Sequence, residues 1–104
     1  DYYPLTAFSA DADSWLAWQF NVPEKGEGIV QAFRRAGSSF YGRQLKLQGL
    51  DPAGAYVLTD LDTPDKAQEY SGRQLMEQGL AVHVPNQPGA VVITYKKQAR
   101  HAEK

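Results

Sequence analysis

The feature that most constrains this fold is an alternation of side chains with a period of two, repeated in several short segments. In WLAWQFNV, residues 15–22, the apolar Leu16, Trp18, Phe20 and Val22 share one parity. That period is typical of a half-buried β-strand. Turn-forming residues separate further short segments, which lie at 28–36, 43–50, 55–62, 80–85 and 89–96. The pattern predicts an all-β fold, an antiparallel Greek-key-type β-sandwich of about seven to eight strands.

Two hairpins are expected where strands flank a compact turn. Residues 43–50 and 55–62 flank DPAG, in which proline suits the turn. Residues 80–85 and 89–96 flank PNQPG in the same way. We therefore expect each of these two pairs to be hydrogen-bonded neighbours.

One helical turn is expected, at residues 73–79. Ser71 is a suitable N-cap and Gly79 a suitable terminator. The segment GRQLMEQGL (72–80) matches GRQLKLQGL (42–50) at seven of nine positions. A second pair of similar segments is displaced along the chain by a different number of residues. We therefore interpret the matches as segments of similar composition and not as a structural repeat.

The apolar parity of each strand predicts the core. Truncation of Trp18 or Phe20 is then expected to be strongly destabilising. The expected core residues are Leu16, Trp18, Phe20, Ile29, Phe33, Leu45, Leu47, Leu58, Val82, Val84 and Ile93.

Composition narrows the function classes. The chain has 104 residues, enough for one domain, and a formal net charge of −1. No basic face is available, so we expect neither nucleic acid nor a membrane as a partner. The absence of cysteine excludes disulfides and thiolate metal sites. It favours a cytoplasmic location slightly but leaves the compartment open.

Three aspartates are the first candidates for chemistry. Asp60 and Asp62 lie two apart on an expected strand, and Asp51 precedes a proline. Their positions at turns favour a structural role over a glycosidase pair or a calcium loop. The histidines, His83 and His101, form no triad or metal pattern. We predict no catalytic, cofactor-binding or metal-binding residue and no cofactor.

Aromatic residues are the remaining candidates for a functional surface. Trp15 has the parity opposite to Trp18, so it is expected to be exposed. Exposed aromatic side chains mark an interdomain contact or a sugar-binding surface. The candidates for such a surface are Trp15, Tyr2, Tyr3, Phe40 and Tyr41.

Taken in order, several phrases resemble one known family. They are DYYPLT, DSWLAWQF, GEGIVQAFRR, LKLQGLDPAGAYVLTDLD, SGRQLMEQGL and AVVITYK. Together they are similar to the C-terminal domain of bacterial glycoside hydrolase family 36 α-galactosidases, over residues 1–97. Residues 98–104 are expected to form a polar tail. In that family the catalytic aspartates lie in a (β/α)8 barrel, and Asp60 and Asp62 match only the structural phrase of the terminal domain.

The resemblance implies an inactive domain cut from a larger enzyme. Its partner would be the catalytic barrel of the same parent chain, which it would stabilise, and a homo-oligomer is left open. The parent would be a retaining hydrolase of terminal α-galactosides. Two alternatives remain. One is a carbohydrate-binding accessory module, which needs a row of exposed flat aromatics. The other is a small enzyme, for which the sequence shows no set of acid, base and nucleophile.

Overall fold

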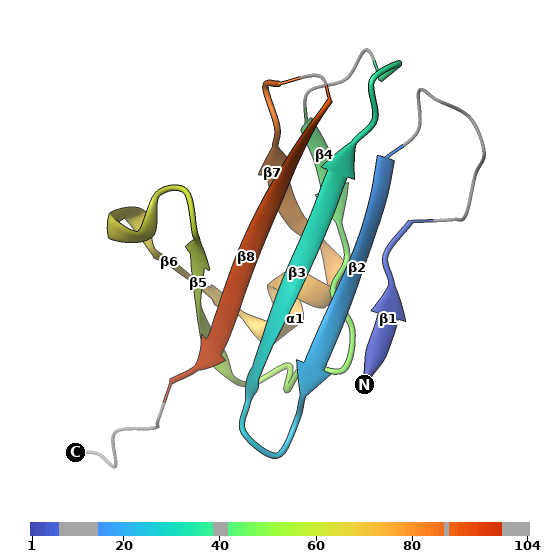
Figure 1. The fold of residues 1–104 in the computed structure, drawn as a ribbon. Helices are drawn as coiled ribbons and strands as arrows, with labels where there is room; N and C mark the ends of the chain where they lie inside the picture. The colour runs from blue at the N-terminus through green and yellow to red at the C-terminus, as the bar shows by residue number, and fades with distance from the viewer. Residues whose placement is uncertain (7–14, 39–41, 87, 99–104) are drawn as a thin grey trace.

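The computed structural model describes residues 1–6, 15–38, 42–86 and 88–98 of the chain. These residues form eight strands and one short α-helix, with a single 3-10 turn (Figure 1). The elements are β1 (Tyr2–Pro4), β2 (Trp15–Val22), β3 (Glu27–Arg34), β4 (Gly42–Leu45), β5 (Ala55–Asp60), η1 (Pro64–Lys66), β6 (Gln68–Ser71), α1 (Gly72–Glu77), β7 (Leu80–His83) and β8 (Gly89–Lys97).

The strands form two sheets of unequal size. A six-stranded sheet has the order β1-β2-β3-β8-β5-β6, and a two-stranded sheet pairs β4 with β7. Every pairing is antiparallel. In Figure 1 the small sheet and α1 lie behind the large sheet, which turns its other face toward the viewer. The antiparallel two-sheet architecture and the strand number expected from the sequence are confirmed.

Both predicted hairpins are wrong. β4 pairs with β7 and not with β5, whereas β8 pairs with β3 and β5 and not with β7. β4 and the next strand, β5, therefore lie in different sheets, as do β7 and β8. A strand followed by a tight turn looks the same in sequence whether the next strand lies beside it or across the core.

The single helix is confirmed at the predicted place. The Ser71 Oγ atom accepts a hydrogen bond of 3.0 Å from the Gln74 backbone amide, which caps the first turn. Gly79 has a φ of +97°, and its amide donates to the Gln74 carbonyl at 3.0 Å. Only glycine adopts this left-handed conformation at low cost, so the helix ends here.

The core lies between the two sheets. Six of the predicted core residues are buried, namely Leu45, Leu47, Leu58, Val82, Val84 and Ile93. They pack with buried residues on the inner face of the large sheet and with Leu75 of α1. The inner-face residues include Trp15, Ala17, Val30, Ala32, Tyr56, Val91 and Tyr95.

Five predicted core residues are wrong, and all lie on β2 and β3. Phe20 and Phe33 are 43% and 42% exposed, and Leu16, Trp18 and Ile29 are only half-buried. The side chains that point inward from β2 are those of the opposite parity: Trp15, Ala17, Gln19 and Asn21.

Buried polar side chains explain the reversed parity of β2. The Gln19 amide nitrogen donates to the Gln48 carbonyl and to the Tyr95 hydroxyl, both at 2.8 Å, and its oxygen accepts from the Gln48 amide at 2.9 Å. Asn21 donates to the Gly49 carbonyl at 3.1 Å and accepts from the Tyr95 hydroxyl. Paired in this way, two amides can be buried at little cost.

Tyr95 is the centre of this network. Burial raises the pKa of the Tyr95 hydroxyl to about 12, although the hydrogen bond from Gln19 partly opposes the shift. Gly28, which faces Tyr95 on the neighbouring strand, leaves the space that the hydroxyl fills. The network therefore needs glycine at position 28 of β3 and tyrosine at position 95 of β8.

Candidate functional site

The outer face of the six-stranded sheet carries four of the five large hydrophobic side chains that are exposed among the described residues. Cross-strand register places its residues side by side: Phe20 pairs with Ile29, and Ile29 with Thr94. We define the outer face by its main side chains, which are Tyr2, Leu16, Trp18, Phe20, Val22, Ile29, Gln31, Phe33, Val57, Thr59, Val92 and Thr94. A face of this composition is typical of an interaction surface.

The aromatic side chains of the outer face pack against one another in pairs. Tyr2 and Phe20 have ring centroids 5.2 Å apart and planes inclined by 55°. Trp18 and Phe33 are 5.5 Å apart and inclined by 35°. The Trp18 indole also donates to the Gln31 side-chain oxygen at 2.7 Å. The described rings therefore form a ridge of tilted aromatics and not the flat row that a sugar-binding module requires.

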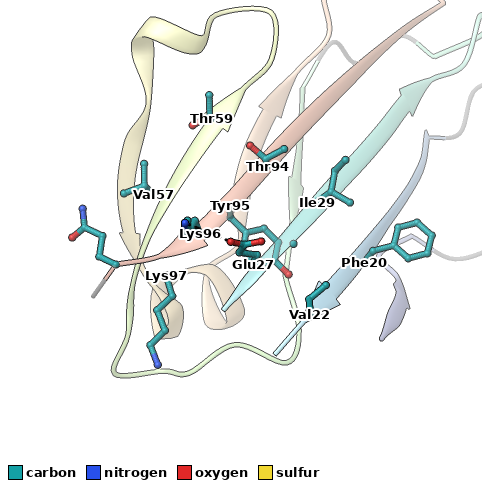
Figure 2. Close-up of a pocket in the computed structure, with 12 residues that line it drawn as sticks. Phe20, Val22, Glu27, Ile29, Val57, Thr59, Thr94, Tyr95, Lys96 and Lys97 are labelled. Atoms are coloured by element: carbon teal, nitrogen blue, oxygen red, sulfur yellow. Dashed lines mark ion pairs between the residues drawn. The ribbon is translucent and has the colours of Figure 1, made fainter. Parts of the chain in front are cut away.

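Beside this ridge the outer face is hollowed. We call this hollow, of ≈ 710 Å³, the trough. Figure 2 shows its main side chains, which come from four neighbouring strands: Phe20 and Val22 from β2, Ile29 from β3, Thr94 from β8, and Val57 and Thr59 from β5.

Charges gather at one end of the trough. The Lys96 ammonium lies 3.6 Å from a Glu27 carboxylate oxygen (Figure 2). Both side chains are substantially exposed, so the pair adds little stability. Its position makes the surface polar at the end of the apolar strip.

The predicted surface residues fall into three groups. The expectation that Trp15 is exposed is wrong: it is 2% exposed, and its indole donates to the Ser38 hydroxyl at 3.1 Å. Tyr2 is 56% exposed, as expected, and Tyr3 is half-buried. Phe40 and Tyr41 lie outside the described residues. The sequence signal for the outer face was the all-apolar parity of β2, which had been assigned to the core.

The three aspartates make turns. Asp60 accepts a 2.9 Å hydrogen bond from the Asp62 amide, and Asp51 accepts one of 3.0 Å from the Ala53 amide. Asp51 also pairs with Lys97 at 2.8 Å. These are the local contacts of aspartate in turns. Across the described ranges, no three His, Cys, Asp or Glu side chains lie together in a way that could hold a metal ion.

Among the described residues, no helix is long and apolar enough to cross a bilayer. The only α-helix there, α1, has six residues.

The fold and the uncovered face together define a class: an antiparallel β-sandwich domain with an apolar outer sheet. Residues 15–95 match the model of the glycosyl hydrolase family 36 C-terminal domain. The chain belongs to this family.

Solved structures of α-galactosidases share the fold. AgaB from Geobacillus stearothermophilus is 27% identical, with a TM-score of 0.66, and the match covers 93% of this chain. An α-galactosidase from Lactobacillus brevis is 14% identical, with a TM-score of 0.76 over 99% of this chain. The galactosidase domain of AgaSK, an α-galactosidase–sucrose kinase, is 21% identical, with a TM-score of 0.70.

The matched proteins are much longer than this chain. It covers 13% of the AgaB and AgaSK chains and 14% of the Lactobacillus brevis chain. A domain of this family thus sits alongside other domains in those proteins. No curated protein is similar enough to this chain to count as a match.

Proposed function

We propose that this chain is the non-catalytic C-terminal domain of a family 36 α-galactosidase, and that it stabilises a catalytic (β/α)8 barrel by packing against it. The parent enzyme would hydrolyse terminal α-galactosides with retention of configuration. The observation that carries the proposal is the family match over residues 15–95, in a chain that covers 13% of the α-galactosidase AgaB.

The geometry supports a role in packing and not in chemistry. Asp60 and Asp62 are engaged in a turn, one receiving the amide of the other. A retaining glycosidase needs two carboxyls about 5–5.5 Å apart across a pocket that holds the sugar. The hollow on the outer face is lined mainly by apolar side chains and threonines, and its one carboxylate, Glu27, faces Lys96.

The first test uses the gene that contains residues 1–104. We expect it to encode a catalytic barrel before residue 1. The purified full-length protein should hydrolyse a chromogenic α-galactoside, whereas the purified 104-residue chain should not. In the full-length protein, Asp60→Asn and Asp62→Asn should leave turnover unchanged, because these side chains form a turn.

The second test removes the domain. A parent protein that ends before residue 1 should melt several degrees lower than the full-length protein, because the barrel loses a permanently docked partner. The proposal is wrong if the gene encodes no barrel or if truncation leaves the barrel's melting temperature unchanged. Turnover by the 104-residue chain, abolished by Asp60→Asn, would also overturn it.

A further inference from the structure

The trough is bounded by two strands whose separation is close to the width of one α-helix. Its two walls stand on β2 and β5, with β3 and β8 between them. Strands in a sheet lie about 4.8 Å apart, so the strands that carry the walls are about 14 Å apart. An α-helix with its side chains is about 10–12 Å across. Phe20 and Val22 form one wall, and Val57 and Thr59 form the other (Figure 2).

The chemistry of the trough suits the apolar stripe of an amphipathic helix. The floor carries Ile29 and Thr94, which are directly paired in register, and at one end the Glu27–Lys96 pair, which the register places between Val22 and Val57. The walls carry the half-exposed ring of Phe20 and the branched Val22 and Val57. A helix with apolar side chains at every third or fourth residue commonly packs on a sheet surface of branched and aromatic side chains.

The first residues of the chain lie beside this wall. Asp1 and Asn21 are hydrogen-bonded to each other in both directions, each at 2.7 Å. Asn21 lies between Phe20 and Val22 in the sequence, and the Tyr2 ring packs on Phe20. In the proposed parent enzyme, the catalytic part would therefore join this domain at β1, the neighbour of the strand that forms one trough wall.

From these observations we propose that an α-helix of the catalytic part of the same polypeptide lies along the trough, parallel to the strands, between the β2 wall and the β5 wall. The proposal rests on the proposed function and adds the surface and the kind of partner element. The Glu27–Lys96 pair then lies at the polar end of the interface, where it stays in contact with water.

The experiment uses the absence of cysteine from this chain. Thr94→Cys and Thr59→Cys place near-isosteric thiols on the floor and on the β5 wall. Thr63→Cys, at an exposed threonine after β5, is the matched control. Each variant is prepared as the 104-residue chain and as the full-length protein. Labelling by a maleimide is followed at each site by mass spectrometry of peptides, which separates these thiols from any cysteine of the barrel.

The expected result is protection in the full-length protein only. The thiols of Thr94→Cys and Thr59→Cys should label about ten-fold or more slowly in the full-length protein than in the isolated chain, because a docked helix excludes the reagent. The Thr63→Cys control should label at the same rate in both. Adding Phe20→Asp to the full-length Thr94→Cys variant should restore fast labelling, and adding Leu61→Asp, at an apolar side chain exposed outside the trough, should not.

Other occupants give different results, and each overturns the proposal. Protection of the isolated chain that rises with its concentration would mean a second copy. Protection of the isolated chain by galactose or raffinose would mean a sugar site. Free labelling of Thr94→Cys in an active full-length α-galactosidase would reject the trough as the interface but leave the proposed function intact. A full-length protein without a barrel or without α-galactosidase activity would reject both.

Discussion

The two faces of the six-stranded sheet differ in how side-chain composition relates to burial. The inner face holds fewer apolar side chains on β2, yet it is the buried one, because Gln19 and Asn21 are paired with Tyr95 and with a loop backbone. The outer face of β2 is wholly apolar, yet Phe20 is 43% exposed. The difference teaches that apolar parity alone does not identify the face that a domain buries within itself, because paired polar side chains can be buried while an apolar face stays exposed.

The largest expected difference between the faces lies in the two tryptophans of β2. Trp15→Ala should lower the free energy of unfolding of the 104-residue chain by about 3–5 kcal/mol, because the ring is buried in the core. Trp18→Ala should cost only about 1 kcal/mol, since its ring is half-buried and contacts Phe33 and Gln31 on the surface.

Urea unfolding of the two variants, followed by circular dichroism, measures this difference. Equal losses for the two tryptophans, or a larger loss for Trp18→Ala, would show that the outer face is stabilised within this chain and would remove the contrast between the faces.

The next effect concerns the polar network of the inner face. Tyr95→Phe should cost about 1–3 kcal/mol, because it leaves the Asn21 side-chain oxygen buried without its hydroxyl partner. Tyr70→Phe is the control, because the Tyr70 hydroxyl makes its hydrogen bond to Gln68 at the exposed edge of the sheet. Thermal melts of the two variants at pH 7 should separate them by several degrees.

The same hydroxyl predicts a pH dependence. The Tyr95 pKa is about 12 in the folded chain, against an ordinary value of 10.0. The folded state therefore retains a proton that the unfolded chain releases, so deprotonation favours unfolding. The contribution is complete below pH 10 and is lost as the pH rises toward 12. Urea midpoints between pH 9 and pH 12 should fall for the wild type, and less steeply for Tyr95→Phe.

Phe20 on the outer face should behave in the opposite way. Phe20→Ser should change the stability of the isolated chain by only about 0.5–1 kcal/mol, because the ring is half exposed and packs on Tyr2, which is itself exposed. It should also reduce aggregation at high concentration, because it breaks an exposed apolar surface. Urea unfolding and light scattering check both. A loss as large as that of Trp15→Ala would mean that Phe20 belongs to the core.

Local patterns predicted the strands well and their neighbours poorly. Leu45, Leu47, Val82 and Val84 were assigned correctly, because each is flanked on both sides by solvent-exposed residues, so the alternation there has one inner and one outer side. The alternation on β2 separates two faces of the strand, but it does not show which of them packs against the small sheet. The amide pairs of Gln19 join residues far apart in sequence, so no local pattern contains them.

The tetrapeptide GRQL makes the same point at two places. Gly42–Leu45 is strand β4, whereas residues 72–75, with the same sequence, begin helix α1. The second copy follows a capping serine and the first follows tyrosine. The first copy pairs with β7, and its Gln44 side chain donates to the carbonyls of Gln78 and Gly79 at 2.9 and 3.3 Å. Capping and tertiary pairing decide the conformation, because the propensity of four residues is too weak to do so.

The structure has an exposed apolar face, but most of its residues are not those that the sequence indicated. An apolar interdomain surface was expected, but Trp15 was assigned to it because Trp18 had been placed in the core. Tyr2 was assigned correctly as exposed. Phe20 and Phe33 were missed because strong hydrophobicity normally signals burial within the same domain. In a domain that covers only 13% of related chains, that rule extends to surfaces that other domains can cover.

The smallest expected difference lies in two lysines at the end of β8. Lys97 forms a 2.8 Å pair with Asp51 on the inner side, whereas Lys96 forms a 3.6 Å pair with Glu27 on the outer side. Lys97 is 36% exposed and Lys96 is 73% exposed, so solvent screens the Lys97 pair less. Lys97→Met should therefore cost about 0.5 kcal/mol, and Lys96→Met should be close to neutral in the isolated chain.

Urea midpoints measured at low salt and at about 0.5 M NaCl test this, because the difference between the variants should shrink to about zero as salt screens the charges. A difference that persists in salt would mean that the Lys97 stem contributes by packing next to Gly26 and Gly54, which would sharpen the contrast between the two faces by another route.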